Sequence, residues 1–312
     1  MTERDDNGRG PVLLTGATGF VGSRVARRLA QAGSRVRAIV RAKGAPELAD
    51  PDVAPWIDEI EGDFTRPETA AAAARGVDAV VHCAATAGPD METARHVNVE
   101  GTRSMVEAAR AAGVLRYVHV STLSVYARTS LETMDESAPI KEEGDPYGLT
   151  KAEADRVVLE SMERGLSSVI FRPGAILGFH RTSTWAVRMP RRIRDRQMKL
   201  RGDGRETIPW LHVDDLADTV LLALEDDRAV GRIYDMTDGA VTWRDYTDEV
   251  RGWFGAPPLE SIPEAEIGGY STARFEAGRV RRELGYRPRR DYASGMAEAA
   301  AYWARENAAH GS

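Results

Sequence analysis

Tyr147 and Lys151 are the two side chains of this sequence whose types and spacing best suit proton transfer. They stand four residues apart, in a segment that begins with Asp145 and Pro146. An Asp N-cap and a Pro at the first helical position predict a helix, on which Tyr147 and Lys151 share one face. A phenol ordinarily has a pKa of about 10, and a nearby ammonium favours the phenolate. Because many helices contain such a pair by chance, its meaning depends on what precedes it.

A group of hydroxyl side chains precedes this pair by about 25 residues. Residues 116–121 (RYVHVS) read as a strand, and Ser121, Thr122 and Ser124 lie at its carboxyl end. Ligands of open α/β sheets bind outside the carboxyl ends of the strands. The order of strand hydroxyls and then Tyr-x-x-x-Lys therefore indicates one shared site.

Residues 12–33, VLLTGATGFVGSRVARRLAQAG, form the element around which the rest of the chain is organised. An apolar run leads into a glycine-spaced turn, after which Val21, Val25 and Leu29 recur at helical spacing until Gly33 ends the helix. Such glycines let a pyrophosphate approach the backbone, and the first helical turn offers N–H groups to an anion. The turn predicts a dinucleotide site with contacts from Gly16, Thr18, Gly19, Phe20, Val21 and Gly22.

Strand and helix patterns alternate along the chain and predict an α/β fold, a Rossmann-type doubly wound parallel sheet with a smaller, mostly C-terminal α/β substrate domain. Strands are expected at residues 12–14, 36–40, 57–61, 78–83, 116–121 and 168–172, with helices over about 69–74 and 93–112. Residues 232–235 are expected to add a strand, so that the domains interleave. The dinucleotide domain then comprises residues 11–172 and about 212–238, and the substrate domain about 173–211 and 239–312, after a disordered tail at 1–10.

The end of the second strand bears on the choice of dinucleotide. NAD-binding relatives of this motif place an acidic residue about 20 positions after the glycines, whereas Arg41 stands here with Lys43 close behind. An arginine fork can grip a phosphate, which favours NADP (NADPH) over NAD. The alternative is an arginine merely solvated at a strand end.

Further cofactor contacts are predicted at the ends of later strands. Asp63 either accepts a hydrogen bond from the adenine amino group or caps the helix over 69–74. Small residues after the strand at 78–83 let a cofactor lie across its end. The complete set of these predicted contacts is Asp63, Phe64, Ala84, Ala85, Thr86 and Pro173, together with Tyr147 and Lys151.

Several segments agree in order and spacing with one family. They are TGATGFVG at 15–22, GD at 62–63, HCAA at 82–85, NVEGT at 98–102, VSTLSVY at 120–126, YGLTK at 147–151, RPG at 172–174, HVDDLA at 212–217 and ELGYRP at 283–288. Over about residues 11–303 the chain resembles the extended short-chain dehydrogenase/reductase family, whose members include NAD-dependent epimerases and dehydratases.

The resemblance implies that hydride moves between nicotinamide and carbon while Tyr147 moves a proton to or from the oxygen. Lys151 is then expected to hold the nicotinamide ribose and, with the positive nicotinamide ring, to lower the pKa of Tyr147. Thr122 matches the hydroxyl that bonds the substrate oxygen, with Ser121 and Ser124 as rivals. Asn98 either orients the site or packs within its helix.

Departures from the family pattern narrow the range of reactions that we expect this protein to catalyse. Leu123 and Ser124 stand where sugar-nucleotide 4,6-dehydratases carry an Asp-Glu pair. Ile208 stands where many epimerases carry the Arg of GDG-x-x-x-R, and FRPGAILG lacks the Asn of galactose epimerases. We therefore expect an NADP-dependent ketoreductase or alcohol dehydrogenase acting on a small or hydroxylated carbonyl. The alternatives are a nucleotide-sugar epimerase or 4-ketoreductase and, disfavoured by the intact Thr122, Tyr147 and Lys151, a non-catalytic NADP-binding regulator.

Composition sets the remaining expectations. A net charge of −6 with 42% hydrophobic residues fits a globular protein and gives no reason to expect nucleic-acid binding. Without an 18-residue apolar run, an apolar leader or a second cysteine besides Cys83, we expect a cytoplasmic protein with no membrane span and no metal. The resemblance also implies a homodimer. The basic stretch at 182–205 is either a solvated helix face or a lid for an anionic substrate or the cofactor phosphate.

Overall fold

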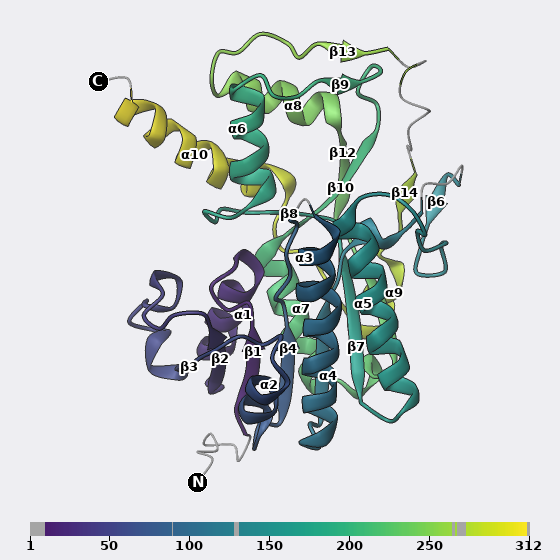
Figure 1. Ribbon diagram of the computed structural model, residues 1–312. Coiled ribbons are helices and arrows are strands. Elements are labelled where there is room, and N and C mark those ends of the chain that lie inside the picture. The colour runs from purple at the N-terminus through teal and green to yellow at the C-terminus, as the bar shows by residue number, and fades with distance from the viewer. Residues whose placement is uncertain (1–9, 89, 128–130, 264–265, 267–272, 311–312) are drawn as a thin grey trace.

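A parallel sheet is the central element of the protein (Figure 1). The computed structural model describes residues 10–88, 90–127, 131–263, 266 and 273–310. Within these residues seven strands lie in the order β11-β7-β5-β4-β1-β2-β3, and every neighbouring pair is parallel. The strands are β1 (Val12–Thr15), β2 (Val36–Val40), β3 (Ile57–Glu61), β4 (Ala79–His82), β5 (Arg116–Val120), β7 (Ser168–Pro173) and β11 (Arg232–Met236). The predicted doubly wound sheet is confirmed, including the late strand β11.

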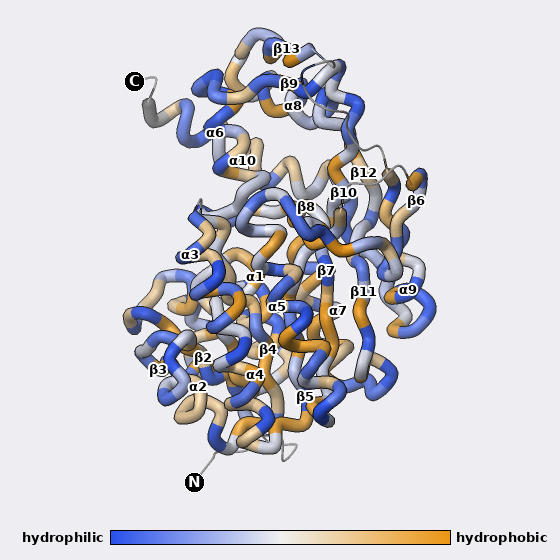
Figure 2. Tube along the Cα trace, turned by 45° about the vertical axis from the view of Figure 1, so that its right-hand side comes forward, coloured by the Kyte–Doolittle hydropathy of each residue, from blue (hydrophilic) through white to orange (hydrophobic). Residues whose placement is uncertain are grey.

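Helices cover both faces of this sheet. On one face lie α1 (Phe20–Gln31), α7 (Val213–Glu225) and α9 (Gly278–Leu284), and on the other α2 (Pro67–Ala74), α4 (Gly101–Ala111) and α5 (Pro146–Glu163). Successive residues of a strand face opposite sides, so Leu14 packs with the first group and Leu13 with the second. Figure 2 shows β4, β7 and α7 as predominantly hydrophobic, with hydrophilic segments nearer the outside.

The helix expected over residues 93–112 is not regular. It consists of α3 (Met91–Arg95), a π-helical turn η3 (His96–Glu100) and α4. The sequence pattern did not predict the π turn, because one five-residue turn is too short for its period to be distinguished from that of an α-helix. Such turns are frequent at functional sites, and this one carries Asn98.

A second, smaller unit lies beyond the carboxyl ends of the parallel strands (Figure 1). Its three-stranded sheet has the order β12-β10-β8, formed by β8 (Ala175–Leu177), β10 (Thr207–His212) and β12 (Gly239–Thr242). Its helices are α6 (Met189–Arg194), α8 (Trp243–Gly252) and α10 (Tyr292–His310), and its two-stranded ladders pair β9 (Leu200–Arg201) with β13 (Ser261–Ile262) and β6 (Thr133–Met134) with β14 (Arg274–Phe275). The described residues also form the single-turn helices η1 (Pro46–Leu48), η2 (Ala54–Trp56), η4 (Leu123–Val125), η5 (Thr184–Arg188) and η6 (Asp227–Ala229).

The structure departs from the expected domain boundaries at both ends. α9 belongs to the segment assigned to the substrate domain, yet Val280 and Leu284 pack in the core beside α1 and α7. Gly10, assigned to the tail, donates its N–H to Asp78 at 2.6 Å, and residues 1–9 lie outside the described residues. The overall division into two interleaved domains stays a prediction. Among the described helices, none has the length and apolar character needed to cross a membrane.

Candidate active site

The glycine turn between β1 and α1 forms a cradle that a dinucleotide phosphate fits. Gly16 has a φ of +72°, and a Cβ there would lie 2.8 Å from the backbone nitrogen of Ala84. A Cβ on Gly22 would lie 2.1 Å from the carbonyl oxygen of Gly16, so a side chain cannot be accommodated without moving the turn. Gly19 is the N-cap of α1 and brings no side chain to the first-turn N–H groups. The predicted contacts Thr18, Phe20 and Val21 are half-buried in this turn.

Asn98 clamps the loop after β4. Its Oδ1 accepts from the N–H of Thr86 at 2.8 Å, and its Nδ2 donates to the carbonyl of Thr86 at 2.9 Å and to Oγ1 of Thr150 at 2.9 Å. Asn98 is buried, and Thr150 lies on α5 next to Lys151. Of the two predicted roles, the contacts favour positioning: Asn98 ties the predicted cofactor loop Ala84–Thr86 to α5.

Two other predicted cofactor residues, Asp63 and Phe64, make contacts within the protein. Asp63 does not cap α2, whose N-cap is Arg66; its Oδ1 instead accepts from the N–H and hydroxyl of Thr65 at 2.9 and 2.8 Å. That part of the prediction is wrong, because the helix begins at Pro67 and its N-cap position is therefore Arg66, three residues after Asp63. The ring of Phe64 packs on Gly101 and edge-on to His82, so its side chain serves the core.

The remaining two predicted cofactor residues lie at strand ends. Arg41 is exposed directly after β2, as a contact with an adenosine phosphate requires. Pro173 ends β7, where it pairs in register with Met236 of β11.

Thr122 and Tyr147 meet at the carboxyl end of β5. Thr122 follows β5 and is the N-cap of η4, which packs against α5. Asp145 caps α5, as predicted, by accepting from the N–H of Gly148 at 2.8 Å. The side chains of Thr122 and Tyr147 are close enough that the Thr122 hydroxyl lowers the pKa of the Tyr147 phenol. The structure thus brings the predicted substrate-binding hydroxyl and the predicted proton donor together.

The pKa of Tyr147 lies above its usual value. Burial raises the pKa to about 12, and the adjacent Thr122 hydroxyl opposes this effect only in part. The amine of Lys151 binds groups other than Tyr147: its Nζ donates to the carbonyl of Val120 at 2.8 Å and to Nε2 of His119 at 3.3 Å. Lys151 is therefore not among the groups that lower the pKa of Tyr147 in this arrangement.

Lys151 is a buried amine. Only 1% of the residue is exposed. Burial lowers its pKa to about 8, although the nearby carboxylate of Asp155 raises it. Its contact with His119 requires a neutral imidazole that accepts at Nε2, and burial holds the pKa of His119 well below its usual value.

A buried polar chain, which the sequence analysis missed, continues from Lys151 across the sheet. Oδ1 of Asp155 lies 3.5 Å from Nε2 of His119 without a hydrogen bond to it, and Oδ2 of Asp155 accepts from Nε of Arg172 at 2.9 Å. Nη1 of Arg172 donates to the hydroxyl of Tyr126 at 2.8 Å, and that hydroxyl donates to Oδ1 of Asp235 at 2.7 Å. Burial raises the pKa of Asp235 to about 7. A signal was available: Asp155 lies one helical turn after Lys151.

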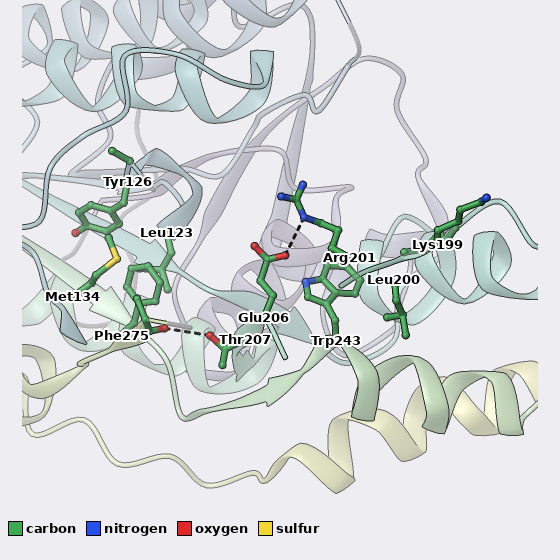
Figure 3. A pocket seen from close by; sticks show the side chains of 13 residues that line it. Leu123, Tyr126, Met134, Lys199, Leu200, Arg201, Glu206, Thr207, Trp243 and Phe275 are labelled. Carbon is green, nitrogen blue, oxygen red and sulfur yellow. Dashed lines mark hydrogen bonds and ion pairs between the residues drawn. The ribbon is translucent and has the colours of Figure 1, made fainter. Parts of the chain in front are cut away.

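A cavity of about 380 Å³ opens beside η4, directly after Thr122. Figure 3 shows its lining side chains, which come from both units of the fold. They are Leu123, Tyr126, Ala127, Met134, Met198, Lys199, Leu200, Arg201, Glu206, Thr207, Trp243, Ala273 and Phe275. The spacing of these residues along the chain does not predict the cavity.

The basic stretch contributes both to this cavity and to surface ion pairs. Arg194 lies 2.8 Å from Asp195, Lys199 lies 3.0 Å from Glu260, and Arg201 lies 3.6 Å from Glu206. Arg205 is paired with Asp203. These carboxylate partners favour the solvated-face interpretation over a lid that attracts anions.

The sequence model of one protein family, the NAD dependent epimerase/dehydratase family, matches residues 12–236. The chain belongs to this family. Members of the extended short-chain dehydrogenase/reductase group are therefore its relatives, as the resemblance implied. The 2-alkyl-3-oxoalkanoate reductase of Stenotrophomonas maltophilia is 31% identical over 80% of this chain and 77% of its own.

Two further relatives of this epimerase/dehydratase family member cover nearly its whole length. The 4-hydroxy-2-methyl-3-oxo-4-farnesyl-3,4-dihydroquinoline-1-oxide ketoreductase of Stigmatella aurantiaca is 30% identical over 91% of this chain and 94% of its own. The solved dTDP-glucose 4,6-dehydratase DesIV from Streptomyces venezuelae, with NAD bound, is 30% identical and has a TM-score of 0.79 over 95% of this chain and 97% of its own. The family thus includes oxidoreductases and dehydratases that use NAD(P).

Proposed function

We propose that this protein is an NADP-dependent oxidoreductase that interconverts a ketone and a secondary alcohol. The observation that carries the proposal is the position of Thr122 next to Tyr147 at the carboxyl end of β5, where η4 packs on α5, with Lys151 one turn further along α5. Two neighbouring hydroxyls can both bond one carbonyl oxygen.

In this mechanism each side chain has a separate task. The nicotinamide cofactor supplies or accepts the hydride. Thr122 donates a hydrogen bond to the substrate oxygen as charge develops there, and Tyr147 donates the proton in the direction of reduction. Lys151 favours the phenolate form of Tyr147 when its ammonium turns toward the active site, and Asn98 holds the Ala84–Thr86 loop in place.

The residue after Thr122 argues against dehydration. Expelling a hydroxyl group from a sugar needs an acid beside the site, and Leu123 is buried in an apolar cluster at the position where dehydratases carry the Asp. The next residue, Ser124, is exposed and donates its N–H to Oγ1 of Thr122 at 3.1 Å. Two relatives are named for the reduction of ketones, a 2-alkyl-3-oxoalkanoate and a quinoline oxide, which supports the same assignment.

The coenzyme preference rests on Arg41 and Lys43, both exposed after β2. A guanidinium at this position suits the 2′-phosphate of NADP, whereas it offers no acceptor to a ribose 2′-OH. We propose NADP as the preferred coenzyme, with NAD as the weaker one. A homodimer and a cytoplasmic location stay predictions from the sequence.

A nucleotide-sugar epimerase or 4-ketoreductase is the second candidate, favoured by the similarity to DesIV along the whole chain. Against it, Ile208, at the position of the diphosphate-binding Arg, is buried in the core of the second unit.

The decisive experiment is to mix the purified protein with NADPH and a panel of carbonyl compounds and to follow absorbance at 340 nm. We expect NADPH oxidation with at least one non-nucleotide ketone, and none with the Tyr147→Phe variant. If no ketone of the panel is reduced while a UDP- or dTDP-sugar raises the melting temperature strongly, the second candidate replaces the first.

A further inference from the structure

We propose that the cavity beside η4 binds an uncharged aliphatic or aromatic group of the substrate, so that the substrates are ketones with a bulky apolar substituent. This inference rests on the proposed reductase function and specifies its substrate class. The cavity is defined by its lining residues, which in Figure 3 extend from Tyr126 and Met134 on one side to Leu200 and Lys199 on the other.

The position of the cavity fits this role. Leu123 is the residue after Thr122, and Tyr126 directly follows the same single turn η4. We therefore place in this cavity the substituent of a ketone whose oxygen is held by Thr122 and Tyr147. The opposite wall comes from β9, β10 and α8 of the second unit, so the cavity lies where the two units face each other.

The lining is mainly apolar. Aliphatic side chains come from η4, β6, β9 and the residue Met198, and aromatic rings come from Tyr126, Trp243 and Phe275. The hydroxyl of Tyr126 is already bonded to Arg172 and Asp235, so Tyr126 offers the cavity its ring. Such a surface gains free energy by excluding water from another apolar group.

The charges of the lining oppose a nucleotide diphosphate. Lys199 lies 3.0 Å from Glu260 and Arg201 lies 3.6 Å from Glu206, so the two cations are balanced by two carboxylates. Glu206 itself lines the cavity, and Figure 3 shows it directed toward Arg201. A diphosphate would have to approach this carboxylate and compete with it for the guanidinium. An uncharged group is not repelled by the carboxylate and does not compete for the guanidinium.

The size of the cavity sets the expected range of substrates. At about 380 Å³ it lies near the lower end of pockets that bind small ligands, roughly 300–1,000 Å³. Each methylene group moved from water into it should strengthen binding about fourfold until the cavity is full.

A chain-length series tests this inference kinetically. With NADPH and the ketones 2-butanone, 2-heptanone and 2-undecanone, we expect kcat/KM to rise steeply with chain length. Met198→Asp, which places a charge in the lining, should flatten the series. Ala127→Phe, which fills part of the cavity, should move the best substrate to a shorter chain. The matched control is Leu115→Asp, an exposed leucine before β5, which should keep the wild-type series.

Binding measured without turnover separates this inference from the proposed function. In the presence of NADP⁺, 2-undecanone should raise the melting temperature more than 2-butanone or dTDP at the same concentration. If no ketone is reduced but this order holds, the reductase proposal fails and the cavity assignment stands. If ketones are reduced at rates independent of chain length, or if dTDP gives the largest shift, the cavity assignment is wrong.

Discussion

Replacing Asp155 by Asn tests the buried polar chain behind the candidate site. Asp155 is 2% exposed and accepts from Arg172, itself 2% exposed, at 2.9 Å. Removing one partner of a buried ion pair leaves the other charge without compensation, which costs about 3–5 kcal/mol. We expect Asp155→Asn to lower the free energy of unfolding by about that amount, toward the lower figure because Arg172 keeps its bond to Tyr126. Urea unfolding followed by circular dichroism measures this change.

The same substitution should also move the pH dependence of turnover. The carboxylate of Asp155 is the protein group that most raises the pKa of Lys151, which burial holds at about 8. Without that carboxylate the pKa of Lys151 falls further, so its ammonium is lost at a lower pH. The alkaline limb of the kcat profile should therefore shift to lower pH in Asp155→Asn.

Glu153→Gln is the matched control on the same helix. Glu153 pairs with Arg95 at 2.8 Å, but both side chains are partly exposed, and such pairs contribute about 0–1 kcal/mol. If Asp155→Asn is no more destabilising than Glu153→Gln, and the two pH profiles coincide, the reasoning about the buried chain is refuted.

Three further predictions concern single side chains. Tyr147→Phe should lower kcat by roughly 10²–10⁴-fold with little change in the Kd for NADPH, measured by fluorescence titration; comparable turnover would exclude Tyr147 as the proton donor. Arg41→Asp should shift the NADP/NAD ratio of kcat/KM toward NAD by about 10- to 100-fold, and an unchanged ratio would show that Arg41 does not contact the phosphate. Asp235, with a pKa raised to about 7, stays protonated in the folded state while the unfolded chain ionises near pH 4, so stability should fall as pH rises from about 4 to 7. Asp235→Asn should remove this part of the fall in urea titrations at several pH values, and parallel curves for variant and wild type would contradict the assignment.

The sequence predicted those parts of the structure that local patterns determine. Apolar runs such as residues 78–83 become strands because both faces of a parallel sheet are covered, and Asp145 and Pro146 start α5 because they satisfy its first N–H groups. Gly16 and Gly22 were identified because only glycine tolerates the close approach of Ala84 and of the Gly16 carbonyl.

What the sequence could not predict depends on contacts between distant segments. Met134, Trp243 and Phe275 come from β6, α8 and β14, and Met198 from the segment before β9; nothing in their spacing shows that they line one cavity. The orientation of Lys151 also escaped prediction, because it is decided by His119 on β5, 32 residues earlier. The family pattern gives the residue type at position 151, but not the acceptors that surround it in this chain.

Tyr126 links these two unpredicted features. Its ring lines the cavity, and its hydroxyl joins Arg172 to Asp235 in the polar chain that reaches Lys151 through Asp155. A buried guanidinium stays where its acceptors are fixed, and the ring of Tyr126 lies against it, with the Arg172 guanidinium carbon 4.9 Å from the ring centre. A substrate group that packs on the ring of Tyr126 therefore contacts the side chain that binds Arg172. Arg172 in turn binds Asp155. Tyr126 thus contributes its ring to the apolar wall that we assign to the substrate and its hydroxyl to the interactions that hold Arg172. The carboxylate of Asp155, which Arg172 binds, raises the pKa of Lys151.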